Sequence, residues 1–267
     1  MNQSQPHAQI AAASAYEELF VPALFQQWTH LLIQAAGLEP GSHVLDVACG
    51  TGVLARDALS TVGPSGSVSG TDPNPGMLEV ARRLAPEVDW KRGTAEALPF
   101  PGESFDCVIS QFGLMFFSDH VESVREMLRV LVSGGRLVLS VWDTLERSPA
   151  FADEVSLLER TAGTDAANAL RAPFVLGNKD DLVQIANQAG VSSVAVNTHQ
   201  GTARFPSIRS LVEADLRGWL PVMDIHLQEE EIQRILAEAE GALSEHVNTQ
   251  GEAVFQVSAH ILSGTKA

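Results

Sequence analysis

Short apolar runs alternate with amphipathic stretches through the middle of the chain. Five of these runs predict buried β-strands, at residues 43–48, 68–71, 88–91, 105–110 and 136–142. Between them, apolar residues recur at helical spacing, as they do at Met77, Leu78, Ala81 and Leu84. Strands separated by helices predict a parallel, doubly wound α/β sheet that binds its ligands at the carboxyl ends of the strands.

Residues with a strong capping preference mark the starts of two of these helices. Asn74 precedes Pro75, which suits the first helical position, and Asp119 precedes a second helical pattern. The second helix is expected to end at the small residues Ser133, Gly134 and Gly135.

The flanks of this core predict helices that cover the sheet and strands that complete it. The first nine residues are polar, and we expect them to be unstructured; residues 16–36 carry a helical pattern with a break at Pro22. After residue 143 the pattern predicts helices at 150–161, 178–189, 207–220 and 228–243, and strands at 191–198 and 253–262. We therefore expect one domain, residues 1–267, with a helical insertion at about residues 200–247 that caps the sheet.

Charge and cysteine content narrow the classes of partner. The 267 residues carry a formal net charge of −16, distributed over both halves of the chain, which disfavours a nucleic acid or an anionic membrane surface. The two cysteines, Cys49 and Cys107, form neither a disulfide framework nor a metal site. The first basic residue is Arg56 and no apolar run is long enough to span a bilayer, so we expect a cytoplasmic protein without a membrane partner.

The most informative stretch is VLDVACGTGVLAR, residues 44–56. A hydrophobic strand ends near Asp46, and the glycines Gly50 and Gly52 then lead into a helix. Glycines in such a turn adopt backbone angles closed to other residues, and the amides at the helix start suit an anionic or polar ligand group. Asp72 lies twenty residues beyond Gly52, where an acid in such folds accepts hydrogen bonds from a ribose diol.

Three interpretations of this loop remain open from the residues alone. The glycines also fit the dinucleotide fingerprint of a nicotinamide or flavin site, and a purely structural turn is a further possibility. Asp46 argues against a dinucleotide, because its carboxylate would repel a pyrophosphate. It suits a ligand with a cationic amino group and no phosphates, such as S-adenosylmethionine.

Four sequence blocks resemble class I S-adenosylmethionine-dependent methyltransferases, in the group of the ubiquinone/menaquinone C-methyltransferases and many small-molecule methyltransferases. They are VLDVACGTG, VSGTDPNPGMLEVAR, GTAEALPFPGESFDCVIS and REMLRVLVSGGRLVLSVW. They follow the family's order. The resemblance implies a seven-stranded, Rossmann-like sheet with a helical cap, in which residues 40–142 form the cofactor-binding core, residues 1–36 supply cap helices and residues 143–267 complete the sheet.

The resemblance also assigns cofactor-binding residues. It implies Asp46, Ala48, Cys49, Gly50 and Gly52 around the methionine part, Asp72 at the ribose hydroxyls, Pro73, Asn74 and Met77 beside the adenosine, Thr94, Ala95 and Glu96 at the adenine edge, and Gln111 near the sulfonium. Two residues depart from the family pattern, which usually has Gly at position 48 and Asp at position 94. The second departure removes a carboxylate acceptor for the adenine amino group.

The chemistry of methyl transfer does not by itself require a particular catalytic residue. Methyl transfer from a sulfonium is an in-line displacement that depends on alignment at about 3 Å and on exclusion of water, and a base is needed only when the acceptor keeps its proton. The candidates are Tyr16, Gln111 and His120, while His30 and His226 fit surface positions better. We expect no metal.

An apolar acceptor is suggested by aromatic and aliphatic residues near the expected cleft. They are Phe112, Leu114, Met115, Phe116, Phe117, Trp142 and Trp219. We therefore expect S-adenosylmethionine-dependent methyl transfer to a small, apolar or aromatic molecule. An NAD(P)-linked oxidoreductase and a non-catalytic S-adenosylmethionine-binding protein are the alternatives.

Overall fold

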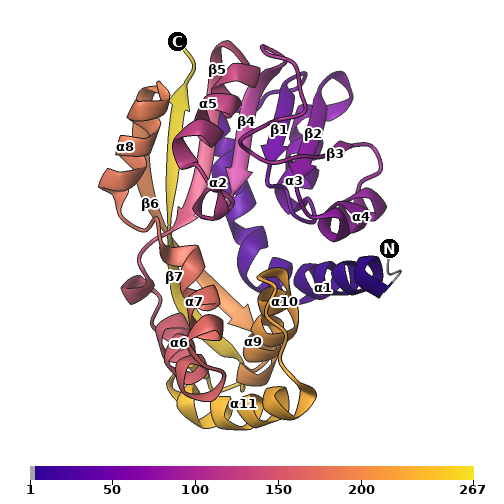
Figure 1. Cartoon of the computed structure of the whole chain (residues 1–267). Helices are drawn as coiled ribbons and strands as arrows, with labels where there is room; N and C mark the ends of the chain where they lie inside the picture. Colours follow the sequence, from indigo (N-terminus) through magenta and orange to yellow (C-terminus); the bar gives the residue numbers. More distant parts are fainter. Residues whose placement is uncertain (1–3) are drawn as a thin grey trace.

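The computed structural model describes residues 4–267 and is built around a seven-stranded sheet with the order β3-β2-β1-β4-β5-β7-β6 (Figure 1). The strands are β1 (His43–Val47), β2 (Ser67–Asp72), β3 (Asp89–Arg92), β4 (Phe105–Gln111), β5 (Leu131–Trp142), β6 (Ser192–Phe205) and β7 (Ala253–Thr265). The strands from β3 to β5 are parallel, whereas β7 is antiparallel to both β5 and β6. The predicted mostly parallel, doubly wound sheet of seven strands is confirmed.

Helices pack on both faces of the sheet and at one end of it. They are α1 (Ser4–Phe20), α2 (Gln26–Ala36), α3 (Val53–Val62), α4 (Pro75–Leu84), α5 (His120–Val130), α6 (Pro149–Thr161), α7 (Thr164–Arg171), α8 (Lys179–Ala189), α9 (Ile208–Ala214), α10 (Leu220–Val222) and α11 (Glu229–Ala242). Two π-helical turns, η1 (Val21–Phe25) and η6 (Asp215–Trp219), join neighbouring helices. None of the helices in the described part of the chain combines the length and apolarity needed to cross a bilayer.

The predicted capping residues occupy the expected helix starts. The Asn74 side chain accepts hydrogen bonds from the amides of Gly76 and Met77, at 2.8 and 3.3 Å. Asp119 accepts one from the amide of Glu122 at 2.9 Å. These local bonds satisfy amides that have no partner within the helix, so α4 and α5 begin where the sequence indicates.

The amino-terminal prediction is wrong for residues 4–9, which belong to helix α1 rather than to an unstructured segment; residues 1–3 lie outside the described part. Helix α1 packs across α4, and a Cβ at Gly76 would collide with the backbone of Gln9. This close approach of two helices supplies the tertiary contact that the polar sequence does not reveal. The break expected near Pro22 is the π-helical turn η1.

Strand β6 is longer than predicted, so the helical insertion starts later than residue 200. The strand continues to Phe205 because β7 pairs with it along its length, from Ser192 opposite Thr265 to Phe205 opposite Ala253. Helix α7, which the pattern did not predict, packs with α6. In Figure 1, α6, α7, α9, α10 and α11 gather at the end of β6 and β7, and we call these five helices the cap.

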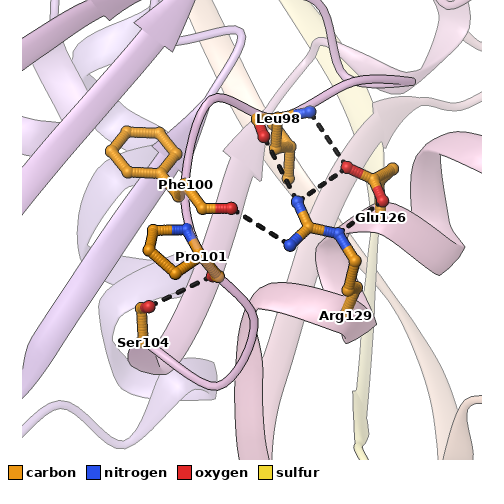
Figure 2. A network of polar contacts seen from close by, with 6 residues as sticks. All are labelled: Leu98, Phe100, Pro101, Ser104, Glu126 and Arg129. Atoms are coloured by element: carbon orange, nitrogen blue, oxygen red, sulfur yellow. Dashed lines mark hydrogen bonds and ion pairs between the residues drawn. The ribbon is translucent and has the colours of Figure 1, made fainter.

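A polar network attaches the loop before β4 to helix α5 (Figure 2). Arg129 donates to the carbonyl oxygens of Phe100 and Leu98, at 3.0 and 3.2 Å, and pairs with Glu126. Glu126 in turn accepts the amide of Leu98 at 3.0 Å. The hydrogen bond from Arg129 lowers the pKa of Glu126. The network holds the start of the LPFPGESFD segment against helix α5.

Candidate functional site

A cavity of about 480 Å³ lies where the parallel strands end, between the sheet and the cap. Its volume is within the range of small-molecule sites. Its wall includes Ala48, Gly50, Asp72, Pro73, Asn74, Met77, Thr94, Ala95, Glu96 and Gln111, which are ten of the thirteen residues that the sequence resemblance assigns to a cofactor. Because these residues follow β1, β2, β3 and β4, the parallel sheet brings them to one edge. We call this space the polar cavity.

Asp72 connects the end of β2 to the glycine loop after β1. Its Oδ2 accepts a hydrogen bond from the amide of Gly50 at 3.0 Å, and its Oδ1 accepts the amide of Asn74 at 2.8 Å. Burial raises the pKa of Asp72 to about 6, although these two amides lower it. Each carboxylate oxygen has a further lone pair, so Asp72 retains acceptor capacity toward a ligand on the cavity wall.

The amides of the glycine loop are largely used within the protein. Gly50 donates to Asp72, Gly52 to the carbonyl oxygen of Cys49 at 2.8 Å, and Cys49 to that of Thr71 at 3.0 Å. A dinucleotide site needs loop amides that face the pyrophosphate. This arrangement therefore favours a ligand without phosphates at the loop.

Three of the residues assigned from the resemblance, Asp46, Cys49 and Gly52, are not part of the cavity wall. Asp46 is 1% exposed, and no side chain among residues 4–267 donates a hydrogen bond to its carboxyl oxygens. Burial raises its pKa well above the usual value, while the amide of Ala55 in the first turn of α3 lowers it. Asp46 thus lies behind the loop at the helix start. Gly52 is the left-handed N-cap residue of α3, where an added Cβ would collide with the Trp90 ring.

Gln111 and Tyr16 also line the polar cavity. The Gln111 side chain donates to the carbonyl oxygen of Phe25 at 3.2 Å, and its own Oε1 is buried with no acceptor bond to any described residue. Burial raises the pKa of Tyr16, and the charges of Asp72 and Glu17 raise it further. The phenol therefore stays protonated at neutral pH and is a hydrogen-bond donor or a wall rather than a base.

Thr94 and Glu96 form the outer end of the polar cavity. Thr94 is exposed, and Glu96 accepts the amide of Ser118 at 2.8 Å. Burial is the largest single effect and opposes ionisation of Glu96, but hydrogen bonds from its own amide, from Ser118, from Asp119 and from Thr94 together lower its pKa. Glu96 is thus a carboxylate in hydrogen-bond contact with Thr94.

The histidine candidates lie outside the polar cavity. His120 is the half-buried first residue of α5, and His30 and His226 are exposed. His226 is 3.6 Å from Asp224 on the surface. Of the three catalytic candidates, the fold brings Tyr16 and Gln111 to the cavity and leaves His120 apart from it.

A smaller cavity of about 70 Å³, here called the aromatic cavity, adjoins the polar one and shares four of its wall residues, Tyr16, Phe112, Phe116 and Trp219. The rest of its wall is Phe20, Leu24, Phe25, Trp142, Phe151, Leu170, Pro173, Phe174 and Asp215. The Phe112 and Trp142 rings stack with centroids 3.8 Å apart. Phe116 packs against Trp219, whose indole N–H donates to the Ala169 carbonyl oxygen at 2.9 Å.

The aromatic cavity confirms part of the predicted apolar cluster. Phe112, Phe116, Trp142 and Trp219 line it, Phe117 lines the polar cavity, and Leu114 and Met115 are buried in the core. The sequence did not single out Phe20, Phe25, Phe151, Phe174 or Asp215. These residues come from four separate segments, and both π-helical turns, η1 and η6, contribute to this wall. Such turns often occur at functional sites, but the sequence pattern does not distinguish them from ordinary helix.

Comparison with known sequences finds a family match over the strands and loops that form the polar cavity. Residues 44–135 match the methyltransferase domain family. Over 128 residues, 46% of this chain, the sequence is 40% identical to the ubiquinone/menaquinone biosynthesis C-methyltransferase UbiE of Hahella chejuensis, of which the match covers 51%. The chain therefore spans about half the length of the curated relatives it matches.

Solved structures share the fold over most of the chain. The YcgJ protein from Bacillus subtilis has a TM-score of 0.60 and 22% identity, over 90% of this chain and 98% of that one. Phosphoethanolamine N-methyltransferase 2 of Haemonchus contortus, in complex with S-adenosyl-L-methionine, has a TM-score of 0.60 and 17% identity, over 95% of this chain and 56% of that one. The family match and the sheet together thus show a methyltransferase domain sequence at residues 44–135 within the mostly parallel, seven-stranded sheet that the sequence resemblance implies.

Proposed function

We propose that this protein transfers the methyl group of S-adenosylmethionine to a small apolar or aromatic acceptor. The observation that carries the proposal is the pair of adjoining cavities, one polar and one aromatic, with Tyr16, Phe112, Phe116 and Trp219 between them. Two reactants, one bound in each cavity, would meet at the boundary that the cavities share. Such a shared boundary favours a two-substrate transfer over simple binding of a cofactor.

The polar cavity has the donors and acceptors that S-adenosylmethionine needs. Asp72 would accept from the ribose hydroxyls, and the unpartnered Oε1 of Gln111 is an acceptor suited to the positively charged part of the cofactor. An added Cβ at Gly50 would meet no protein atom within 4 Å, so the backbone there is open to the ligand. When bound, the cofactor supplies an electrophilic methyl group on a sulfonium.

The protein itself would align the two reactants and exclude water from the space between them. The aromatic wall excludes water from the shared boundary, and the fixed indole of Trp219 and the stacked pair Phe112–Trp142 hold the acceptor's apolar body in place. Tyr16 keeps its proton, so it would position a reactant rather than accept a proton. Glu96 lines the cavity together with Thr94 and would supply a carboxylate at the adenine edge in place of the acid that the family usually has at position 94.

Calorimetric titration tests the cofactor part of the proposal. S-adenosylhomocysteine should bind with one site per chain, and NADH should give no heat. Binding of NADH without S-adenosylhomocysteine would reverse the assignment in favour of an oxidoreductase.

A methyl-labelled cofactor tests the acceptor part. Incubated with extracted small molecules, the protein should label at least one of them, which gains the mass of a methylene. Transfer of label to RNA or DNA, and to no small molecule, would contradict the acceptor class. If S-adenosylhomocysteine binds but no molecule in any extract gains the label, the result would favour a cofactor-binding protein without methyltransferase activity.

A further inference from the structure

Two acidic side chains are buried in the cap behind the aromatic cavity. Asp215 begins the π-helical turn η6, is 2% exposed and lines the cavity. Glu154, on helix α6, has no exposed surface and follows one turn after Phe151, which also lines the cavity. The charge of Asp215 raises the pKa of Glu154, so the two carboxyl groups are neighbours.

These carboxyl groups have unusually few partners. Oδ2 of Asp215 and both carboxyl oxygens of Glu154 are buried, and the hydrogen bond that accounts for part of their pKa shifts is the one between the two carboxyl groups, which needs one of them to be protonated. The described ion pairs of the chain include neither residue, so no Lys, Arg or His compensates them. Burial raises the pKa of both groups above the ordinary range. A buried pair of acids without a cationic partner is costly to ionise, so a cation that binds beside it would be favoured.

The remaining wall of the cavity is apolar and rich in aromatic rings. Phe151 and Phe174 pack with centroids 5.7 Å apart, and Phe116 and Trp219 with centroids 5.2 Å apart. Aromatic faces attract cations electrostatically, most strongly where water is excluded. Asp215 is thus an acid at the end of a pocket whose other walls favour a cation with an apolar body.

We propose that Asp215 binds a basic nitrogen of the methyl acceptor, an aliphatic or arylalkyl amine in its ammonium form, and that Glu154 holds the Asp215 carboxyl in position from behind. The inference rests on the proposed function, since it takes the aromatic cavity as the acceptor site. A hydroxyl group donates one hydrogen bond, whereas a primary ammonium donates up to three and supplies the missing positive charge. A buried acid pair that no cation of the described chain neutralises therefore favours an amine over an alcohol.

The experiment compares two probes of nearly equal shape, 2-phenylethylamine and 2-phenylethanol. Their binding to the full chain, with S-adenosylhomocysteine present, is followed by tryptophan fluorescence, because Trp142 and Trp219 line the cavity. We expect the amine to bind about tenfold more tightly or better, the ratio that a hydrogen bond to a charged group implies. In Asp215→Asn this ratio should fall to near one while the alcohol still binds.

Two further variants separate binding, positioning and folding. Glu154→Gln should reduce the ratio of amine to alcohol affinity, whereas a purely structural role of Glu154 would weaken both probes equally. Asp224→Asn is the matched control, because Asp224 is a fully exposed acid of the same cap region. It should leave the ratio unchanged.

The outcomes distinguish this inference from the proposed function. If S-adenosylhomocysteine binds but the wild-type protein does not prefer the amine, or if the preference persists in Asp215→Asn, the amine site is wrong and the methyltransferase proposal stands. If S-adenosylhomocysteine does not bind to the wild-type protein, the proposed function itself fails. Retained binding of S-adenosylhomocysteine by Asp215→Asn shows that the variant is folded, so its loss of preference then supports the inference.

Discussion

Asp72 accepts a hydrogen bond from the backbone amide of Gly50, 3.0 Å away, and so joins the end of β2 to the loop that follows β1. The same carboxylate accepts the amide of Asn74, the residue that caps α4. One acid therefore holds the glycine loop and the start of α4 in place and forms part of the wall of the polar cavity. A change at Asp72 should act on both the shape of the loop and the ligand.

Replacing Asp72 with alanine should weaken binding of S-adenosylhomocysteine by ~1–3 kcal/mol, the range for a lost hydrogen bond to a charged group. Isothermal titration calorimetry measures the effect. Asp89→Ala is the control, because Asp89 is an exposed acid at the start of β3 that pairs with Lys91. An unchanged dissociation constant in Asp72→Ala would remove Asp72 from the cofactor site.

Gly50→Ala and Gly63→Ala should separate backbone strain from ligand contact. Both glycines have left-handed φ, +54° and +64°, and an added Cβ meets no protein atom within 4 Å at either position. Gly50→Ala should therefore cost about 1–2 kcal/mol of unfolding free energy. Gly63→Ala should cost at least as much, because Gly63 combines its positive φ with ψ −168°, a region nearly closed to other residues; urea denaturation measures both. Of the two glycines only Gly50 lines the polar cavity, so only Gly50→Ala should also weaken the binding of S-adenosylhomocysteine. Equal affinities in the two variants would place the ligand away from Gly50.

The free energy of unfolding of the ligand-free protein should fall as the pH rises from about 4 to about 8. Burial raises the pKa of Asp215 from 3.8 to about 8 in the folded state, and raises that of Glu154 as well. A raised folded-state pKa means that the fold favours the protonated form, so its stabilising contribution is complete below the unfolded pKa and is lost as the pH rises through the folded one.

The double variant Glu154→Gln, Asp215→Asn measures how much of this pH dependence the pair carries. Its unfolding free energy, from denaturant titrations at several pH values, should depend less on pH than that of the wild-type protein. Some dependence should remain, because burial also raises the pKa of Asp46 and Asp72. Identical pH profiles for both proteins would show that the pair is not titrating in the folded state.

Tyr16 provides a spectroscopic test that needs no substitution, because it is the sole tyrosine of the chain. Burial and the charges of Asp72 and Glu17 raise its pKa above the usual value of 10.0. Phenolate absorbance should therefore be absent near pH 10 while the protein is folded and should develop together with alkaline unfolding. The protein in concentrated guanidinium, where the phenol titrates normally, is the reference. Reversible ionisation near pH 10 with the fold intact would place Tyr16 in contact with water.

Local sequence features predicted the part of the molecule that depends on neighbours along the chain. The capping by Asn74 and Asp119, the strands from β1 to β4 and the position of Asp72 at a strand end all follow from short-range pattern and capping chemistry. For β5 the pattern predicted residues 136–142 only; the helix before it ends at Val130 rather than at residues 133–135, and the strand begins at Leu131. The parallel sheet then brings ten of the residues assigned from the resemblance to one cavity. Their contact with a cofactor stays a prediction.

Other features depend on partners far away in sequence and were not predictable in this way. Residues 4–9 are helical because α1 packs on α4, and β6 continues to Phe205 because β7 pairs with it. Asp46 has the carboxyl group expected from the motif, yet it lies behind the loop rather than on the cavity wall. Sequence spacing does not reveal on which side of a loop a buried side chain lies.

By itself, the sequence determined the alternation of strands and helices, the glycine loop and the acid that follows it, because these depend on periodicity and on bonds within a few residues. Only the tertiary structure decided that Asp215 and Glu154, 61 positions apart, are buried together behind an aromatic wall. Their meeting depends on how the cap helices pack over the sheet, and that packing is the sum of many long-range contacts that no local pattern encodes.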